Sequence, residues 1–527
     1  MKNIKEKIEQ TAVVLIDREK EIPGSFGGIF VGAQIIKEAN NNATFVRNLI
    51  SKYKDEIKVP PLIASDFENG CGTMINGLTP LPYLMGLGAT NSEKLAYDYG
   101  KVTALEALSV GSNWSFSPVA DLNINPRNPI VNVRGISDNA DTAIPLLKNV
   151  VKGMQENGLA ACAKHFPGDG VDWRDQHITT SKNLLSLNEW KMKSGRVFEE
   201  IIAAGVYSIM AGHIAFPAYQ KEKFKNQFYL PATLSNELIS GLLKQEMGFK
   251  GVVISDALNM GGFLGWYKNR EQSEIECFKA GCDMLLWPTQ NYIKNMMQAV
   301  ESGFVSIERL DDAYKRIMEM KEKLGLFNMS SGYRELSADE KEFIGKTQKT
   351  LCDKSVTLIR DKNKNLPLSA GNLKKIIIVP VTHYLPAIKE ALHLKEAIEK
   401  RGVKVEYLEK GIPESELETV YGDTDYVIYA LFTRSFRPAG PIDFFADEAM
   451  KIANSQKYGI EKAIIVSFGS PYFINQYFEK ADIFINAYTM LEPAIKAFVR
   501  ALFGEIPFQS FSPVNLDLNQ SISQVES

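Results

Sequence analysis

Apolar runs alternate with helix-like segments along the chain as far as residue 288. Eight of these runs have the length and composition of strands, at residues 12–16, 27–32, 61–66, 113–121, 159–165, 205–213, 251–256 and 282–288. Amphipathic stretches such as 92–111 and 235–248 lie between most of them. Nearly continuous apolar strands that alternate with helices are typical of a parallel sheet covered by helices. Eight repeats predict an α/β fold of the (β/α)8 TIM-like barrel type.

A second alternating region follows a polar, turn-rich stretch. Its strand-like runs lie at residues 355–368, 374–381, 403–409, 425–432, 462–469 and 481–488. The pattern predicts a barrel at 1–330, a linker at 331–354 and a smaller doubly wound α/β sandwich domain at 355–527. Neither G-x-G-x-x-G nor G-x-x-x-x-G-K-[ST] occurs in this region, so no nucleotide site is predicted there.

Polar side chains gather at the C-terminal ends of the barrel's predicted strands. They are Asp66, Asp121, Lys164, His165, His213 and Asp256. The fifth run continues into "AKHFPGDGVDWRDQH" (163–177), which contains two of the five histidines of the chain. Barrels of this type build their active sites at the edge formed by the C-terminal strand ends. The sequence therefore predicts an active site at this edge.

Asp175 and His177 are separated by one residue in the loop after the fifth run. Side chains at such positions can point to the same side of a loop and form a hydrogen bond. A carboxylate bound to one imidazole nitrogen fixes the tautomer and raises the basicity of the other nitrogen. The pair would then serve as a general acid/base. A surface loop with a chance Asp-x-His is the alternative, and Trp173 in the same loop is interpreted as a partly exposed aromatic.

Asp256 ends the run 251–256, although aspartate is a poor strand residue. A carboxylate at the active-site edge can be a nucleophile, a metal ligand or a structural acceptor. The residues that follow, "ALNM", also allow Asp256 to be the N-cap of a helix that begins there. The local pattern leaves the cap and the catalyst equally open.

A metal site is the main rival for the whole cluster, because several barrel hydrolases bind metal through His and Asp at strand ends. The candidate ligands would be His165, His177, His213, Asp66 and Asp256. Such sites usually carry an H-x-H pair at the end of an early strand, and the sequence has none. We therefore expect no metal, and nothing in the sequence indicates a nucleotide or flavin cofactor.

The composition is that of a globular protein, with 45% hydrophobic and 23% charged residues. The 60 basic and 63 acidic residues nearly balance, so neither nucleic acid nor an anionic membrane is expected as partner. No apolar run approaches the roughly 20 residues of a membrane span, and the N-terminal region lacks the features of a secretory signal. Five cysteines without a C-x-x-C pair favour buried, reduced thiols. We expect a cytoplasmic protein.

The stretch "KHFPGDGVDWRDQH" resembles the signature of glycoside hydrolase family 3, in particular its β-N-acetylglucosaminidases of the muropeptide-recycling type. "SDFENG", "MAGHIAFPA" and "GVVISDALNM" agree with that family, and the similarity spans residues 27–325. "VTLIRDKNKNLPL" and "ALFGEIPF" resemble the second domain of many members. The resemblance implies that Asp256 is the nucleophile, His177 the acid/base and Asp175 its partner. It assigns the sugar hydroxyls and the N-acetyl group to Asp66, Arg134, Lys164 and His165.

Departures from the family pattern concentrate in the segment after Asp66. Asn69 and Cys71 stand where the family has a glycine and an arginine, and a further sugar-contacting arginine falls at or near Met74. Asp169 stands where the usual motif has histidine. These differences predict altered recognition of one side of the sugar.

The resemblance implies a retaining exo-β-N-acetylglucosaminidase that hydrolyses terminal β-linked N-acetylglucosamine through a covalent glycosyl-aspartate. The partner would be a small carbohydrate, either a GlcNAc-containing glycoside or a muropeptide. A histidine base is neutral and repels phosphate less than a carboxylate does. A β-N-acetylglucosaminide or β-glucoside phosphorylase with the same residues is therefore an alternative, and an inactive carbohydrate-binding protein is a third hypothesis.

Overall fold

The structure, a computed structural model, describes residues 2–15, 26–32, 43–56, 59–328, 333–383, 387–433, 444, 446–457 and 459–516. The chain divides into two compact units. The barrel unit comprises Met1–Leu81, Ala96–Leu122 and Ala143–Gly345. The sandwich unit comprises Pro82–Leu95, Asn123–Thr142 and Lys346–Ser527. No helix in the described part of the chain is both long enough and apolar enough to cross a membrane.

The barrel unit is built on an eight-stranded sheet in which every paired strand is parallel to its neighbour. A bridge between Ile254 and Met284 joins the two end strands, β9 and β10, and brings the sheet close to a full circle. The predicted (β/α)8 architecture is thereby confirmed. In spatial order the strands are β10 (Leu285–Leu286), β1 (Ala12–Leu15), β2 (Gly28–Phe30), β3 (Leu62–Ser65), β4 (Trp114–Ser115), β5 (Ala160–Phe166), β7 (Ser208–Ala211) and β9 (Val252–Ser255).

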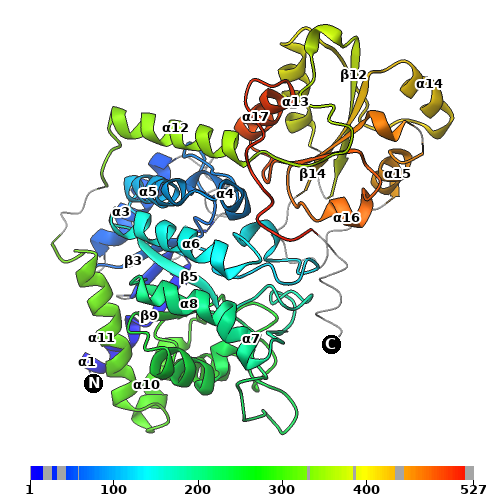
Figure 1. Cartoon of the computed structure of the whole chain (residues 1–527). Helices are drawn as coiled ribbons and strands as arrows, with labels where there is room; N and C mark the ends of the chain where they lie inside the picture. Colours follow the sequence, from blue (N-terminus) through cyan, green and yellow to red (C-terminus); the bar gives the residue numbers. More distant parts are fainter. Residues whose placement is uncertain are drawn as a thin grey trace. The chain divides into compact units, whose positions relative to one another are not determined.

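Helices surround this sheet, as Figure 1 shows for α5, α6, α8, α10 and α11 around β3, β5 and β9. Their bounds are α1 Lys2–Glu9, α3 Ala43–Glu56, α5 Glu93–Ser109, α6 Ala140–Gln155, α7 Leu187–Met192, α8 Ser194–Ala203, the π-helix η4 Glu237–Glu246, α9 Arg270–Ala280, α10 Tyr292–Glu301 and α11 Ile307–Lys323. Because helices cover the outside and side chains fill the inside, strand residues are buried on both faces. Every residue of β5 is buried for this reason.

The interior of the barrel is filled by apolar side chains from all eight strands of the sheet. Trp114 has no exposed surface, and its indole Nε1 donates to the Ser208 hydroxyl at 2.8 Å. Its ring packs edge-on against Phe116 with centroids 4.8 Å apart. Satisfying the indole N–H in this way removes the cost of burying an unpaired donor. The barrel is thus a packed core that fixes the positions of the strand ends.

The sandwich unit contains a six-stranded sheet, in which β11 runs antiparallel to β16 and the remaining pairs are parallel. In spatial order the strands are β11 (Thr357–Asp361), β16 (Ile483–Asn486), β15 (Ala463–Ser467), β14 (Tyr426–Phe432), β12 (Lys375–Thr382) and β13 (Lys404–Tyr407). Successive strand residues point to opposite faces. Accordingly Ile376 and Ile378 belong to one apolar core, whereas Ile377 and Val379 belong to another.

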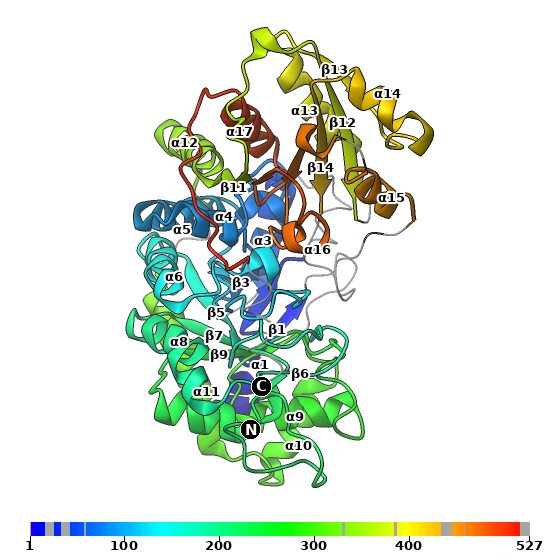
Figure 2. The ribbon, with the colours of Figure 1, turned by 45° about the vertical axis from the view of Figure 1, so that its right-hand side comes forward.

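Each face of this sheet is covered by its own helices (Figure 2). Helices α13 (Ile388–Glu399) and α17 (Glu492–Leu502) contribute to the first core. Helices α14 (Leu417–Gly422), α15 (Ala446–Asn454) and α16 (Phe473–Tyr477) contribute to the second. Helices on both faces of a mostly parallel sheet form the predicted α/β sandwich.

The units do not follow chain order. Met85 and Val133, from two early segments, pack in one apolar cluster with Tyr488 of the sandwich unit. The stretch 331–354, expected to be a linker, contains most of the 18-residue helix α12 (Ala338–Ser355). Its start has a capping box, since Glu340 N bonds to the Ser337 hydroxyl and Ser337 N to the Glu340 carboxylate. The S-x-x-E spacing of this box is visible in the sequence and is the signal that predicts the helix.

Candidate active site

The C-terminal end of β5 brings Lys164 and His165 to the active-site edge of the barrel. The pairing of β5 with β7 is irregular between Lys164 and Phe166, where the register shifts. Lys164 is 3% exposed, and its Nζ lies 3.0 Å from Asp66 Oδ1 and 2.7 Å from Glu68 Oε1. The Asp66 side chain remains 41% exposed. Two carboxylates thus hold the ammonium group while Asp66 keeps surface for a ligand.

His165 is held by Asp121, which sequence analysis placed at the edge but gave no role. Asp121 is fully buried, and its Oδ2 lies 2.7 Å from His165 Nδ1. Its Oδ1 accepts the backbone N–H groups of His165 at 3.1 Å and Asp169 at 2.7 Å. With Nδ1 fixed, His165 Nε2 lies 3.8 Å from Asp256 Oδ2. The sequence could not reveal this arrangement, because it joins residues more than 40 positions apart.

Asp256 follows β9 directly and is 8% exposed. Burial raises the pKa of its carboxyl, but the neighbouring basic side chains of His165, His213, His177 and Lys164 outweigh burial and hold the pKa below its usual value. A carboxylate that stays ionised in this way is suited to act as a nucleophile. The helix-cap interpretation is wrong, because the next α-helix begins at Arg270 and is capped by Asn269.

The Asp175–His177 pair forms as its spacing predicts. Asp175 Oδ1 lies 2.7 Å from His177 Nδ1 and accepts the His177 backbone N–H at 2.8 Å. Asp175 is buried, whereas 32% of the His177 side chain is exposed. The carboxylate therefore binds Nδ1 and leaves the outer ring nitrogen, Nε2, for exchange of a proton.

The loop that carries this pair is tied to the segment after Asp256. Gly261 N–H donates to the His177 carbonyl at 2.8 Å, and Gly262 N–H donates to the Gln176 carbonyl at 3.1 Å. A Cβ atom on Gly261 would lie 2.1 Å from the Ile178 carbonyl oxygen, so this approach requires glycine. The two loops that carry the imidazole and the carboxylate are therefore joined by hydrogen bonds.

His213 has a supporting position rather than an open one. It is fully buried, with Nε2 3.1 Å from the Ala257 carbonyl and Nδ1 2.9 Å from the Thr233 hydroxyl. Because a carbonyl only accepts, Nε2 carries the proton and Nδ1 accepts from Thr233. Burial lowers the pKa of the imidazole. Its backbone N–H donates to Gln176 Oε1 at 2.9 Å, which links the strand end to the loop that carries Asp175 and His177.

Among the described residues, no group of three or more His, Cys, Asp or Glu side chains is arranged to hold a metal ion. The three histidines at the edge are instead bonded to Asp121, Asp175 and Thr233. All five cysteines are buried and free, as expected.

Three further residues of the sequence analysis are Arg134, Trp173 and Cys71. Arg134 is buried in the sandwich unit, where its guanidinium donates to the Ile130 carbonyl at 2.8 Å, and its role toward the sugar stays a prediction. Trp173 is 61% exposed, as an exposed loop aromatic would be. Cys71 is fully buried and bonds through Sγ to the Thr103 carbonyl of α5. The residue at the family's arginine position thus contacts the barrel's own helix.

This fold and the chemistry at its edge are those of a barrel-type glycoside hydrolase. Residues 3–320 match the profile described as the glycosyl hydrolase family 3 N-terminal domain. The chain belongs to glycosyl hydrolase family 3, and the resemblance noted from its motifs is confirmed.

Relatives agree over nearly the whole chain. A protein from Cellulomonas fimi named β-N-acetylglucosaminidase/β-glucosidase is 31% identical over 511 residues, which are 93% of this chain and 89% of the relative. The solved structure of a family 3 β-N-acetylglucosaminidase from Paenibacillus sp. FPU-7 has a TM-score of 0.82 at 27% identity, and the match covers 97% of this chain and 98% of that one. The β-glucoside phosphorylase BglX has a TM-score of 0.88 at 29% identity, with coverage of 97% and 93%.

Proposed function

We propose that the protein is a retaining exo-β-N-acetylglucosaminidase that releases terminal β-linked N-acetylglucosamine. The observation that carries the proposal is the Asp175–His177 pair, whose loop is hydrogen-bonded to the segment after Asp256. An imidazole with Nδ1 held by a carboxylate can give and take a proton at Nε2. A carboxylate with a lowered pKa on the neighbouring loop is a matching nucleophile.

The reaction would proceed in two displacements at the anomeric carbon. In the first, an oxygen of Asp256 bonds to that carbon, the glycosidic bond breaks, and His177 donates its Nε2 proton to the leaving oxygen. In the second, His177 takes a proton from water, the water oxygen bonds to the carbon, and the bond to Asp256 breaks. Each displacement inverts the carbon, so the configuration is retained overall.

The sugar would be held by Asp66, Lys164 and His165, with Arg134 as the fourth member of the set. Asp66 has exposed carboxylate surface that can accept hydroxyl protons, and Lys164 is a fixed donor between two carboxylates. The names of the Cellulomonas and Paenibacillus relatives support N-acetylglucosamine as the sugar. We include in the proposal a cytoplasmic role on small GlcNAc-containing glycosides, among them muropeptides in peptidoglycan recycling, which the motif resemblance supports.

The test is a panel of aryl β-glycosides assayed with and without inorganic phosphate. We expect the N-acetylglucosaminide to be cleaved at least tenfold faster than the glucoside, with free sugar as the main product. Preference for the glucoside would contradict the assigned sugar. Accumulation of sugar 1-phosphate would contradict hydrolysis and favour the phosphorylase, an alternative motivated by the similarity to BglX.

A further inference from the structure

A group of four aromatic side chains, three half-buried and one exposed, lies on the loops that follow the barrel strands. We call it the rim aromatic cluster, and it consists of Phe224, Phe228, Trp266 and Tyr267. Ring centroids are 5.9 Å apart for Phe224 and Trp266, 5.2 Å for Phe224 and Tyr267, and 6.4 Å for Phe228 and Trp266. The phenylalanines come from the loop after β8 (Ile214–Ala215), and the other two rings come from the loop after β9.

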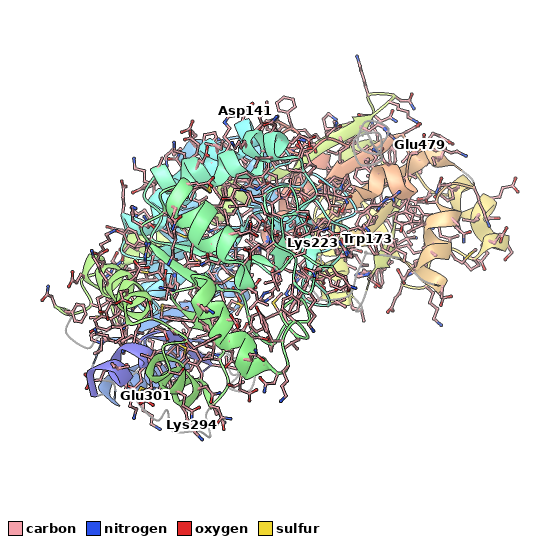
Figure 3. The ribbon with its side chains drawn as sticks, turned by 90° about the horizontal axis from the view of Figure 1, so that it is seen from below. Asp141, Trp173, Lys223, Lys294, Glu301 and Glu479 are labelled. Atoms are coloured by element: carbon pink, nitrogen blue, oxygen red, sulfur yellow. The ribbon has the colours of Figure 1, made fainter. Side chains whose placement is uncertain are left out.

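A tight hairpin presents the two phenylalanines. Phe224 N–H donates to the Phe228 carbonyl at 2.7 Å, and Phe228 N–H donates back to the Phe224 carbonyl at 3.2 Å. Phe228 is 56% exposed. Figure 3 labels Lys223, at the start of this hairpin, together with Trp173 of the acid/base loop. Packing does not explain why the large apolar ring of Phe228 is left in water, and exposed apolar surface beside an active-site edge marks a binding site.

Hydrogen bonds anchor the cluster to the acid/base loop. Trp266 Nε1 donates to the Thr180 hydroxyl and to the Gly262 carbonyl, each at 3.1 Å. The Thr180 hydroxyl donates to the same carbonyl at 2.7 Å. Thr180 is three residues from His177, and three residues of chain span at most about 11 Å. The cluster therefore begins close to the group that would protonate the leaving oxygen.

The geometry points to the rim aromatic cluster as the binding surface for the leaving group of the substrate, an inference that rests on the proposed function. In a retaining glycosidase the acid/base stands on the side of the leaving group. Aromatic faces bind the apolar faces of sugar rings, and an anchored set of half-buried rings with Phe228 exposed is prepared for such contact. The occupant is a second pyranose ring, so the natural substrate is an oligosaccharide or a sugar-linked conjugate rather than a simple alkyl glycoside.

The contrast with Phe263 supports this assignment. Phe263 belongs to the same loop as Trp266 but is fully buried, with its ring 5.4 Å from the His213 ring. Phe263 thus serves the packing of the loop. The rim aromatic cluster contains Phe228, whose ring is mainly in water, and so has surface to offer a ligand.

The experiment compares a disaccharide with the β-glycosyl fluoride of the same sugar, which has no ring to place on the cluster. In Phe228→Ala, the ratio of kcat/KM for the disaccharide to kcat/KM for the fluoride should fall about tenfold, mainly through KM. Phe228→Tyr keeps a ring and should restore the ratio. Phe304→Ala is the matched control, because Phe304 is 45% exposed beside Lys279 on the connection between α10 and α11. It should leave the ratio at the wild-type value.

An unchanged ratio in Phe228→Ala, or the same fall in Phe304→Ala, would overturn the inference. If the wild-type protein cleaves neither substrate, the proposed function is contradicted. The role of the cluster is then tested separately by calorimetry, which measures sugar binding to Asp256→Asn. The disaccharide should bind about tenfold more weakly when Phe228→Ala is added, whereas binding of the monosaccharide should change much less. Equal weakening of both sugars, or no binding of the disaccharide, would overturn the inference.

Discussion

The barrel unit buries charged groups at both ends of its strands, and the two ends treat them differently. At the start of β10, Asp283 is fully buried between the Lys244 ammonium at 2.7 Å and the Arg309 guanidinium at 3.0 Å. Its second oxygen accepts the Val253 N–H at 2.9 Å. Both oxygens of this fully buried carboxylate are thus engaged by groups of the chain, so the cluster is a closed structural one.

At the C-terminal ends of the strands, the charged groups keep atoms available. His165 Nε2 faces Asp256 across 3.8 Å, and the side chains of Asp66 and His177 are 41% and 32% exposed. Burial alone therefore does not distinguish a catalytic carboxylate from a structural one. The distinguishing feature is whether groups of the chain occupy every polar atom around the carboxylate or leave exposed polar atoms for a substrate.

Asp256→Asn should have the largest effect of any single change in this comparison. Removing the proposed nucleophile should lower kcat for an aryl N-acetyl-β-glucosaminide by roughly 10⁴-fold or more. Because Asn preserves the shape of the side chain, the melting temperature should move by only a few degrees. Initial rates and thermal unfolding of the same preparation check both parts. A variant that keeps a tenth of the activity would remove Asp256 from the reaction.

Asp175→Asn should produce the next largest effect, a fall in kcat of about 10²- to 10³-fold. The amide no longer stabilises a proton on His177 Nδ1, so both acid and base functions weaken. The loss should be greater for a methyl glycoside than for a nitrophenyl glycoside, since a poor leaving group needs protonation more. Equal losses for both substrates would indicate that Asp175 only shapes the loop.

Asp283→Asn should lower stability and leave activity unchanged, in contrast to Asp256→Asn and Asp175→Asn. Removing one partner of a buried ion pair leaves Lys244 and Arg309 with less compensation and should lower the free energy of unfolding by about 3 kcal/mol. The value of kcat/KM below the unfolding transition should stay near that of wild type. Urea unfolding and rates at the same temperature test this contrast. A large fall in kcat/KM with unchanged stability would abolish the distinction between the two ends.

Much of this contrast is accessible from sequence. The expected strand 159–165 appears as Ala160–Phe166 and the expected strand 251–256 as Val252–Ser255, because apolar runs closed by polar residues define strand ends well. The expected strand 113–121 is only Trp114–Ser115, since Pro118 cannot donate to a regular ladder. The position of Lys164 at a strand end and the Asp175–His177 pair were both predicted from local patterns.

Other features depend on closure of the barrel. Asp121 reaches His165 only because β4 and β5 are neighbours, so local spacing contains no signal for that bond. The rim aromatic cluster joins two loops that lie about 40 residues apart in the chain. Helix α12 is a different case, because its capping box can be read from the sequence. The polar composition of the stretch 331–354 nevertheless led to its interpretation as a linker.

Lys321→Met should have the smallest effect and concerns the end of the barrel away from the active site. Lys321 is fully buried, its Nζ donates to Gln10 Oε1 at 2.6 Å, and burial lowers its pKa from 10.5 to about 7. Between these values the unfolded chain binds a proton that the folded chain lacks, so this group makes the free energy of unfolding rise with pH.

The substitution should remove about 1 kcal/mol of that rise between pH 7 and pH 8. Urea unfolding of wild type and variant at both pH values measures it. Parallel pH dependence in the two proteins would contradict the lowered pKa of Lys321.

The most direct test of the account is the identity of the residue that becomes glycosylated. The protein is incubated with a fluorinated N-acetylglucosaminyl substrate whose second displacement is slow, and the digested protein is examined by mass spectrometry. The account predicts one sugar per chain, on the peptide that contains Asp256, and no adduct in Asp256→Asn. A sugar attached to a different side chain, or turnover with no adduct and inverted product, would contradict it.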